Sequence, residues 1–505
     1  MDKFWKQFKS GTDIRGVAVE GVAGEPLNLT DEVVASMAGA FLLWLSQRTG
    51  KAVSELKVAV GHDSRISAER IRRAVVDSMV KAGTKVLNCG LSSTPSMFMI
   101  TLDKACDGSI QLTASHHPYH RNGLKFFTPD GGLDGCDIEA ILGFCDEGQQ
   151  PEPHEGGTVE NIDYMKEYAA HLRKLICDGI QSEHYDRPLE GFHIVVDAGN
   201  GAGGFYAYDV LEPLGADITG SVYLEPDGMF PNHIPNPEDK VAMQSICGAV
   251  LGSKADLGVI FDTDVDRGGA VDSFGTEINR NRLVAIAAEI ALEDCAGGTI
   301  VTDSTTSAGL KTFIETTLGG VHYRYRRGYR NVINRAIELN EQGIACPLAI
   351  ETSGHAAFKE NYFLDDGAYL VTKIIIKMAQ LRAQGKTLAE LTADLEEPLE
   401  ERELRFKILR EDFREYGEKV LADLESYAEQ QADWLIADDN REGLRVSFEK
   451  EQGWFLLRLS VHDPIMPLNL ESRKEGGCQE IAAKLYEFLK GCDGLDLAAI
   501  ETYIG

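Results

Sequence analysis

A serine next to two imidazole groups follows an apolar run near residue 110. The run Gly108 to Leu112 is typical of a buried strand, and it leads directly into the segment TASHHP at residues 113–118. Lys125 lies ten residues after Ser115. A serine hydroxyl at a strand end, with imidazole and ammonium groups close by, is able to carry a covalent phosphoryl group. Taken alone, the pattern is equally typical of an ordinary loop.

Three carboxylates stand at alternate positions further along the chain. Asp262, Asp264 and Asp266 directly follow an apolar run that predicts a buried strand. Clustered carboxylates suit a hard cation such as Mg²⁺, and without one they would repel each other strongly. Arg267 beside them is suited to gripping an anionic substrate. An EF-hand calcium loop is excluded, because Arg267 and Ser273 stand where that loop needs Gly and Glu.

Further segments carry recognisable patterns. They are GTDIRG (11–16), VAVGHDSRIS (58–67), EPDGMFPNHIPNPE (225–238), and ETSGH (351–355) with DDG (365–367) after it. Together with TASHHP and DTDVDR, they resemble in content and order the signatures of the α-D-phosphohexomutase superfamily. The resemblance is strongest to its phosphomannomutase/phosphoglucomutase branch, and the last quarter of the chain resembles the family more loosely.

The resemblance implies a mutase that moves phosphate between C6 and C1 of a hexose, either glucose or mannose or both. Phosphorylated Ser115 gives its phosphoryl group to the bound sugar phosphate, and a hexose 1,6-bisphosphate turns around and returns its other phosphate. The implied catalytic residues are Ser115, His116, Lys125 and Arg15. The implied Mg²⁺ ligands are Ser115, Asp262, Asp264 and Asp266. The implied substrate-binding residues are Arg267, Gly328, Tyr329, Glu351, Ser353, His355, Arg458, Ser460 and His462.

The chain departs from the family pattern at several positions. His117 replaces an asparagine in the phosphoserine loop, and Tyr329 replaces a histidine. The family's C-terminal phosphate loop, R-x-S-G-T-E-P, appears here as RLSVHDP at residues 458–464, so that Val461 stands where glycine is usual. For His355, packing behind the sugar-binding loop is as strongly expected as contact with the sugar. These departures leave the transfer chemistry in place and the substrate range open.

Apolar runs that predict strands alternate with helical patterns over the first three quarters of the chain. Examples are the strands at 57–60, 85–87, 194–196, 257–261 and 299–301, and the helices at 31–46 and 68–82. The alternation predicts an α/β fold, and the resemblance implies three similar α/β/α domains with mixed sheets and a smaller α+β C-terminal domain around a central cleft. The expected boundaries are 1–155, 156–296, 297–398 and 399–505. The mixed charges of residues 394–425 predict solvated helix faces.

Composition limits the classes of partner. The net charge of −30 disfavours nucleic acid and anionic membranes. No apolar stretch is long enough to span a membrane, and the start of the chain lacks the pattern of a signal peptide. The ten cysteines are scattered singly, which is typical of thiols in a reducing cytoplasm. We therefore expect a cytoplasmic protein. The resemblance implies that it binds a sugar phosphate as a monomer or homodimer, and we expect the basic residues Arg15, Arg65, Lys125, Arg267 and 324–330 to supply local positive charge.

Other functions stay open at this stage. A phosphoglucosamine mutase of the same superfamily would share every motif. A haloacid-dehalogenase-like phosphatase would use Asp262 as its nucleophile and leave TASHHP without a role, whereas a non-catalytic sensor would bind sugar phosphate without turnover. Gly199, Gly201 and Gly204 also satisfy a dinucleotide-binding pattern, which is weak when it stands alone.

Overall fold

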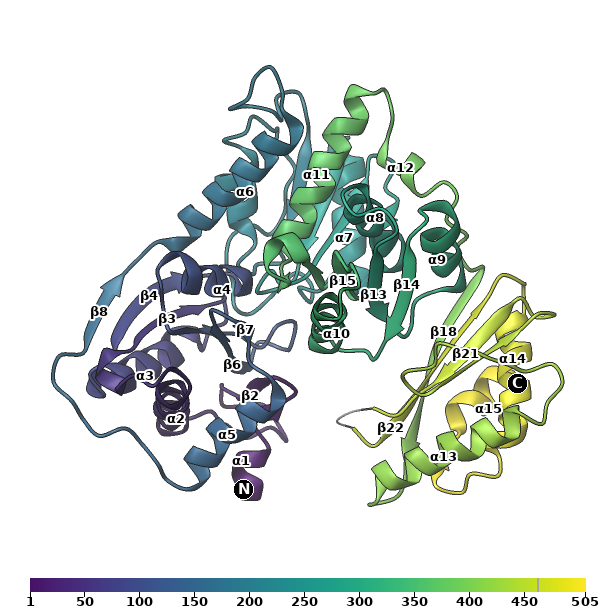
Figure 1. Cartoon of the computed structure of the whole chain (residues 1–505), viewed down its shortest axis with the longest axis horizontal. Coiled ribbons are helices and arrows are strands. Elements are labelled where there is room, and N and C mark those ends of the chain that lie inside the picture. The colour runs from purple at the N-terminus through teal and green to yellow at the C-terminus, as the bar shows by residue number, and fades with distance from the viewer. Residues whose placement is uncertain (461–462) are drawn as a thin grey trace. The chain divides into compact units, whose positions relative to one another are not determined.

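The computed structural model describes residues 1–460 and 463–505. The chain divides into two compact units. Figure 1 labels helices and strands of both units. Unit 1 comprises Met1–Ile290 and Ser353–Leu391, and unit 2 comprises Ala291–Thr352 and Thr392–Gly505. Each unit is therefore built from two separate stretches of chain. The four domain boundaries expected from the sequence are finer than this division and stay a prediction.

Unit 1 begins with a mixed sheet whose strands run in the order β1-β2-β6-β5-β3-β4-β8, with β7 paired to β6. Strands β3, β4, β5 and β8 are parallel, while β1, β2 and β6 pair in antiparallel fashion. The strands are β1 (Lys9–Ser10), β2 (Asp13–Val17), β3 (Lys57–His62), β4 (Lys85–Leu91), β5 (Gly108–Leu112), β6 (Arg121–Thr128), β7 (Gly131–Gly132) and β8 (Thr158–Asn161).

Helices cover this sheet and close its core. They are α1 (Lys3–Lys6), α2 (Asp31–Thr49), α3 (Ala68–Lys81), α4 (Thr94–Asp103) and α5 (Gly135–Asp146). Thr30 caps the start of α2 by accepting a hydrogen bond from the Val33 N–H, and Gly50 ends the helix in the left-handed conformation. Apolar side chains of α2, α3, α5 and the sheet form one buried cluster. This packing fixes the end of β5, where TASHHP begins.

A second sheet in unit 1 has the order β12-β11-β10-β9. Strand β10 pairs with β9 in parallel fashion and with β11 in antiparallel fashion. The elements here are α6 (Tyr164–Ile180), β9 (Ile194–Asp197), α7 (Lys240–Ser253), β10 (Leu257–Phe261), β11 (Gly268–Asp272), β12 (Glu277–Ile278) and α8 (Arg280–Glu293), whose last residues enter unit 2. Every residue of β10 is buried, so that the carboxylates after it start from a rigid strand.

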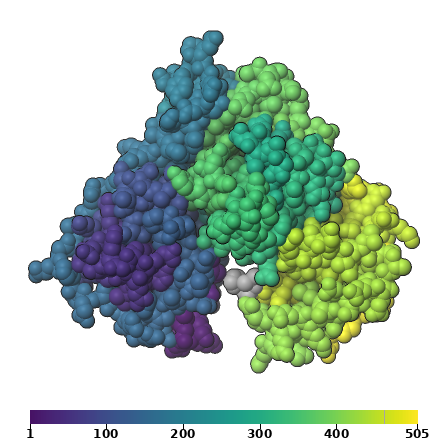
Figure 2. All heavy atoms as spheres, in the orientation of Figure 1, coloured from purple at the N-terminus to yellow at the C-terminus, as the bar shows by residue number. Residues whose placement is uncertain are grey.

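The stretch Ser353–Leu391 returns to unit 1 after an excursion into unit 2. It contains the antiparallel pair β16 (Ala356–Phe358) and β17 (Leu364–Asp365), followed by α11 (Gly367–Ala383) and α12 (Leu388–Leu391). Helix α11 lies beside α6, where Figure 2 shows light green atoms against blue ones. The Tyr206 hydroxyl and the Thr372 hydroxyl are hydrogen bonded, which ties α11 to the second sheet's layer.

Unit 2 contains the parallel strands β13 (Thr299–Asp303), β14 (Val321–Tyr325) and β15 (Leu348–Ile350), in the order β14-β13-β15, with helices α9 (Ala308–Thr312) and α10 (Tyr329–Glu341). Its second part is an antiparallel sheet in the order β19-β20-β21-β22-β18-β23. The elements are β18 (Glu400–Ile408), α13 (Phe413–Ala428), β19 (Leu435–Ile436), β20 (Leu444–Phe448), β21 (Gly453–Leu457), β22 (Ile465–Ser472), α14 (Gly477–Leu489), β23 (Leu495–Asp496) and α15 (Ala498–Ile504).

The predicted α/β class with a smaller α+β end is confirmed, and every strand and helix named above from the sequence is present. The interpretation of residues 394–425 as helix faces was partly wrong. Strand β18 runs through Glu400–Ile408, and Leu404, Phe406 and Ile408 alternate with charged residues along its end. That period of two is typical of a half-buried strand. None of the described helices combines the length and the apolar character that crossing a membrane requires.

Candidate active site

The two predicted catalytic segments meet in unit 1. Ser115 lies just beyond the end of β5 and is 1% exposed. Its hydroxyl donates a hydrogen bond of 3.1 Å to Oδ2 of Asp262, which follows β10 directly. Nδ1 of His116 lies 3.3 Å from the same hydroxyl. A nucleophilic oxygen, an imidazole and a carboxylate from segments far apart in the sequence therefore converge at one point.

The backbone of Ser115 has a φ of +53°, which places this non-glycine residue in the left-handed region. The guanidinium of Arg65, which is almost fully buried, holds the loop in that conformation. It donates hydrogen bonds to the carbonyl oxygens of Ser115 and His117 and, from its other nitrogen, to those of Pro118 and Arg121 at 2.8 and 3.0 Å. One side chain thus satisfies four carbonyls of the loop.

Asp63 stabilises the same loop through Arg65 and Thr113. It accepts from Nε of Arg65 at 3.2 Å and from the Thr113 hydroxyl at 2.8 Å. The Thr113 hydroxyl oxygen in turn accepts from the Ser115 N–H at 2.9 Å. Burial raises the pKa of Asp63, although the nearby Arg65 opposes that shift. The sequence predicted Arg65 only as part of a general basic environment, whereas in the structure its hydrogen bonds stabilise the loop conformation.

The turn after β10 is also held in an unusual backbone conformation. Val265, between two of the predicted metal ligands, has a φ of +67°, which is rare for a β-branched residue. The Gly367 N–H donates to the Val265 carbonyl at 3.1 Å, and the Thr94 N–H donates to the Asp264 carbonyl at 2.8 Å. Strain of this kind persists where the surroundings enforce it, and it is frequent at functional sites.

Asp262, Asp264 and Asp266 are all buried, and one carboxylate oxygen of each lies within 4.8 Å of the others. Lys125 Nζ donates to Oδ2 of Asp264 at 2.9 Å and also to Oδ2 of Asp266. Oδ1 of Asp264 and Oδ1 of Asp266 are buried and accept no hydrogen bond from the described part of the chain. Oxygens of this kind are the ligands that a hard cation takes, so the residues present fit Mg²⁺.

The electrostatics of the three carboxylates also favour a cation. Burial raises the pKa of Asp262 well above its ordinary value, and the charges of Asp266 and Asp264 raise it further. Burial acts on Asp266 in the same direction, but the Lys125 ammonium outweighs it and lowers the pKa of Asp266. A divalent cation would relieve the repulsion that Lys125 only partly offsets.

The two histidines of the loop are neutral at physiological pH. Burial lowers the pKa of His116 to about 2, and the neighbouring charge of Arg267 lowers it further. Burial and the charge of Arg15 lower the pKa of His117 to about 3. Arg15 itself lies on β2 opposite Gly123 of β6, and its guanidinium donates to Asp13 at 3.0 Å. Of the predicted catalytic residues, His116 lies beside Ser115, Lys125 contacts two of the carboxylates, and Arg15 is close enough to His116 and His117 to lower their pKa values.

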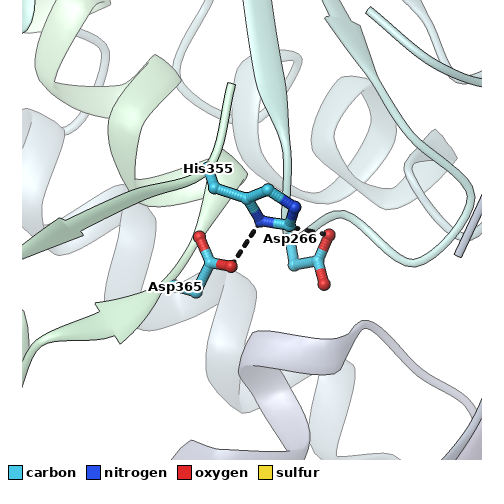
Figure 3. Close-up of side chains that lie close together, drawn as sticks. All are labelled: Asp266, His355 and Asp365. Atoms are coloured by element: carbon cyan, nitrogen blue, oxygen red, sulfur yellow. Dashed lines mark hydrogen bonds and ion pairs between the residues drawn. The ribbon is translucent and has the colours of Figure 1, made fainter. Parts of the chain in front are cut away.

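Arg267 and His355 lie immediately behind the carboxylates. The Arg267 N–H donates to Asp262 Oδ1 at 3.2 Å, and its guanidinium lies 3.5 Å from Glu238. Nδ1 of His355 is hydrogen bonded to Asp365 and lies 3.9 Å from Oδ1 of Asp266 (Figure 3). Both roles expected for His355, packing behind the sugar-binding loop and contact with the sugar, stay predictions.

The remaining predicted substrate-binding residues belong to unit 2, except Ser353, which begins the returning stretch of unit 1. The Gly328 N–H donates to Oε1 of Glu351 at 2.6 Å, and Gly328 has a φ of +115° just before Tyr329 starts α10. The Arg327 N–H donates to Glu442 at 3.1 Å. These contacts show that Glu351 fixes the Gly328 turn.

The predicted C-terminal phosphate loop is only partly described. Burial lowers the pKa of Arg458, and Glu442 and Arg327 are among the charges close to it. The Ser460 N–H donates to the Ile465 carbonyl at 3.0 Å. His462 lies outside the described residues. Arg324, expected to add to the local positive charge, is instead buried against Asp439, with a hydrogen bond of 2.9 Å.

The glycines of the dinucleotide-like pattern have a packing role. A Cβ on Gly201 would lie 2.6 Å from the Thr263 carbonyl oxygen, and one on Gly204 would lie 2.2 Å from that of Leu224. Glycine at position 201 lets the turn after β9 pass close to the carboxylate-bearing turn, and glycine at position 204 lets the chain pass close to the backbone of Leu224.

Sequence reasoning missed the roles of Arg65, Asp63, Thr94 and Asp365. Arg65 and Asp63 belong to VAVGHDSRIS and Asp365 belongs to DDG. These motifs indicated that the residues matter, but the sequence did not show which groups they contact. No sequence motif indicated a role for Thr94. Its hydroxyl donates to Asp264, and this contact depends on the position of α4 in space.

Known families match most of this sequence. Residues 7–149 match "Phosphoglucomutase/phosphomannomutase, alpha/beta/alpha domain I", residues 166–275 match domain II of the same description, and residues 279–399 match domain III. A phosphomannomutase from Escherichia coli is 30% identical over 447 residues, which cover 85% of this chain and 91% of the relative.

Two further similarities extend over nearly the whole length. A phosphomannomutase/phosphoglucomutase from Pseudomonas aeruginosa is 27% identical over 485 residues, covering 95% of this chain and 96% of the relative. A crystal structure of a phosphoglucomutase/phosphomannomutase family protein from Burkholderia thailandensis has a TM-score of 0.79 and 25% identity, and it covers 98% of this chain and 99% of that one.

Proposed function

The chain belongs to the phosphoglucomutase/phosphomannomutase family, and on that premise we propose that it interconverts hexose 1-phosphate and hexose 6-phosphate through a phosphoserine. The resemblance inferred from the sequence motifs is thereby confirmed, and the activity is that of an isomerase. The observation that carries the proposal is the hydrogen bond from the Ser115 hydroxyl to Asp262, at the edge of a buried carboxylate cluster.

We assign the roles of individual residues as follows. Ser115 Oγ carries the phosphoryl group and gives it to the free hydroxyl of the bound hexose phosphate. Neutral His116, 3.3 Å from that oxygen, is placed to exchange a proton with it. Lys125, Arg15 and Arg267 supply fixed positive charge where the transferred group becomes more negative.

The carboxylates of Asp262, Asp264 and Asp266, with the Ser115 oxygen, would hold Mg²⁺. When bound, the ion supplies charge stabilisation for the phosphoryl oxygens. The contribution of the chain itself is rigidity, because Arg65 and Asp63 fix the Ser115 loop before the substrate arrives. Preorganisation of this kind removes the need to order the site during transfer.

The finer assignments rest on the family resemblance. We propose glucose and mannose phosphates as substrates, and a hexose 1,6-bisphosphate as intermediate and activator. Gly328, Tyr329, Glu351, Ser353 and His355 would bind the sugar, and Arg458, Ser460 and His462 its non-transferred phosphate. We also propose a cytoplasmic location, which the free thiols of all ten cysteines support, and a monomer or homodimer.

A haloacid-dehalogenase-like phosphatase is not favoured, because the relatives carry mutase names and Asp262 is occupied by a hydrogen bond from Ser115. The test is a coupled assay with glucose 1-phosphate, mannose 1-phosphate and glucosamine 1-phosphate, each with Mg²⁺ and the matching bisphosphate. Isomerised hexose 6-phosphate is expected. Release of inorganic phosphate, or binding of hexose phosphate without turnover, would contradict the proposal.

A further inference from the structure

A second group of metal-ligating side chains lies beside the three carboxylates. It consists of Asp266, His355 and Asp365, and one donor atom of each lies within 4.8 Å of the others. All three side chains are buried, and Figure 3 shows the His355 ring between the two carboxylates. The group combines one nitrogen donor with two oxygen donors, whereas the first group contains oxygen donors only.

Two oxygens of this group are unused by the described part of the chain. Oδ1 of Asp266 accepts no hydrogen bond there, although Asp266 is only 1% exposed, and His355 Nδ1 lies 3.9 Å from this oxygen. Oδ1 of Asp365, which is 7% exposed, likewise accepts none. Buried carboxylate oxygens without partners are costly, and a bound cation is one way in which proteins satisfy them.

The backbone fixes the three side chains relative to each other. Arg267, next to Asp266, forms an isolated antiparallel bridge with His355. Asp365 lies on β17 opposite Ala357 of β16, two residues after His355. A Cβ on Gly367 would lie 2.3 Å from the Arg267 carbonyl carbon, so the returning stretch approaches the carboxylate-bearing turn closely. The donors therefore come from rigid neighbouring elements.

We propose that Asp266, His355 and Asp365 form a second divalent metal site that takes transition-metal ions such as Mn²⁺, Co²⁺ or Zn²⁺ in preference to Mg²⁺. An imidazole nitrogen suits these ions, while Mg²⁺ is bound mainly through oxygen. Asp266 belongs to both groups, so that the two sites would share its carboxylate.

Binding at this site has a defined proton balance. The His355–Asp365 pair loses the one proton shared in its hydrogen bond to solvent, which leaves an ionised carboxylate and a neutral imidazole that is protonated on Nε2; the Nδ1 lone pair and a carboxylate oxygen then bind the ion. Because Asp266 is shared, an ion in the second site changes the charge that the first site offers. A transition metal is thus expected to alter Mg²⁺ affinity without occupying the Mg²⁺ position.

The test is a Co²⁺ titration of the metal-free full chain, followed by calorimetry and by the visible absorption of Co²⁺. Wild type is expected to bind two ions, one of which excess Mg²⁺ displaces. His355→Gln and Asp365→Asn are each expected to bind one ion, readily displaced by Mg²⁺. Asp262→Asn, which changes only the first group, is expected to keep the ion that Mg²⁺ does not displace. Circular dichroism spectra establish that each variant is folded.

A single Co²⁺ per wild-type chain, fully displaced by Mg²⁺, would overturn the proposal. Two ions bound in both His355→Gln and Asp365→Asn would overturn it equally, because the second ion would then bind elsewhere. Neither result bears on the mutase activity, which is assayed with Mg²⁺ alone. The two proposals therefore fail separately.

Discussion

Arg65 offers the sharpest test of how the Ser115 loop is held. We consider Arg65→Lys, which keeps the charge but loses the planar fork, and Arg65→Met, which keeps much of the length and loses the charge. Arg72→Lys on α3 is the matched control, since Arg72 pairs with Glu69, whose side chain is 60% exposed. Such surface pairs contribute only about 0–1 kcal/mol.

The magnitude follows from the contacts of the guanidinium. Arg65 donates to four loop carbonyls and to Asp63, all in buried surroundings. A hydrogen bond with a charged partner contributes about 1.5–3 kcal/mol. Lysine can replace some of these bonds, so that Arg65→Lys is expected to lower the free energy of unfolding by about 3 kcal/mol. Arg65→Met also leaves Asp63 unpaired, for which about 3–5 kcal/mol is typical.

Urea denaturation measures the free energy of unfolding, and the coupled mutase assay measures kcat and KM. For Arg65→Lys we expect a fall in kcat, with KM for hexose phosphate changed less, since the loop that carries the phosphoryl group loses its fixed geometry. If Arg65→Lys resembles Arg72→Lys in both unfolding free energy and kcat, the loop does not depend on Arg65 and the reasoning is wrong.

Two other predictions concern single residues. Ser115→Ala and Ser115→Gly should both abolish mutase turnover, but Ser115→Gly should be the more stable by about 1 kcal/mol, because only glycine adopts the φ of +53° without strain; equal denaturation midpoints would refute this. Burial raises the pKa of Asp366 to about 6. Between about pH 4 and pH 6 the folded chain therefore keeps a proton that the unfolded chain releases. The stability that this group contributes falls as the pH rises through that window, by up to about 3 kcal/mol. In Asp366→Asn this dependence should vanish, and a difference in unfolding free energy from wild type that is constant with pH would contradict it.

Much of the site could be predicted from the sequence because its chemistry is concentrated in short segments. Ser115 and Asp262 each follow an apolar run that forms a buried strand, and strand ends are where a sheet presents side chains. The types of the residues therefore indicated a phosphoryl carrier and a metal site. The family resemblance then supplied the expectation that the two segments meet.

The rest depended on contacts that no local pattern records. Arg65 is separated from Ser115 by 50 residues, and Thr94 from Asp264 by 170. The pairing of His355 with Asp365 depends on the turn between β16 and β17. In β18, charged residues on the exposed face obscured the alternation of Leu404, Phe406 and Ile408, so that overall charge suggested helix where periodicity indicated strand.

The interleaving of the two units in the sequence has a consequence for synthesis on the ribosome. Residues 353–391 complete unit 1, yet they are translated after the first stretch of unit 2. Chains normally fold domain by domain as they emerge. Here the surroundings of the carboxylate turn at residues 262–266 are incomplete until His355, Asp365 and Gly367 have been synthesised. A nascent chain arrested before residue 353 would therefore carry an unfinished cluster of like charges.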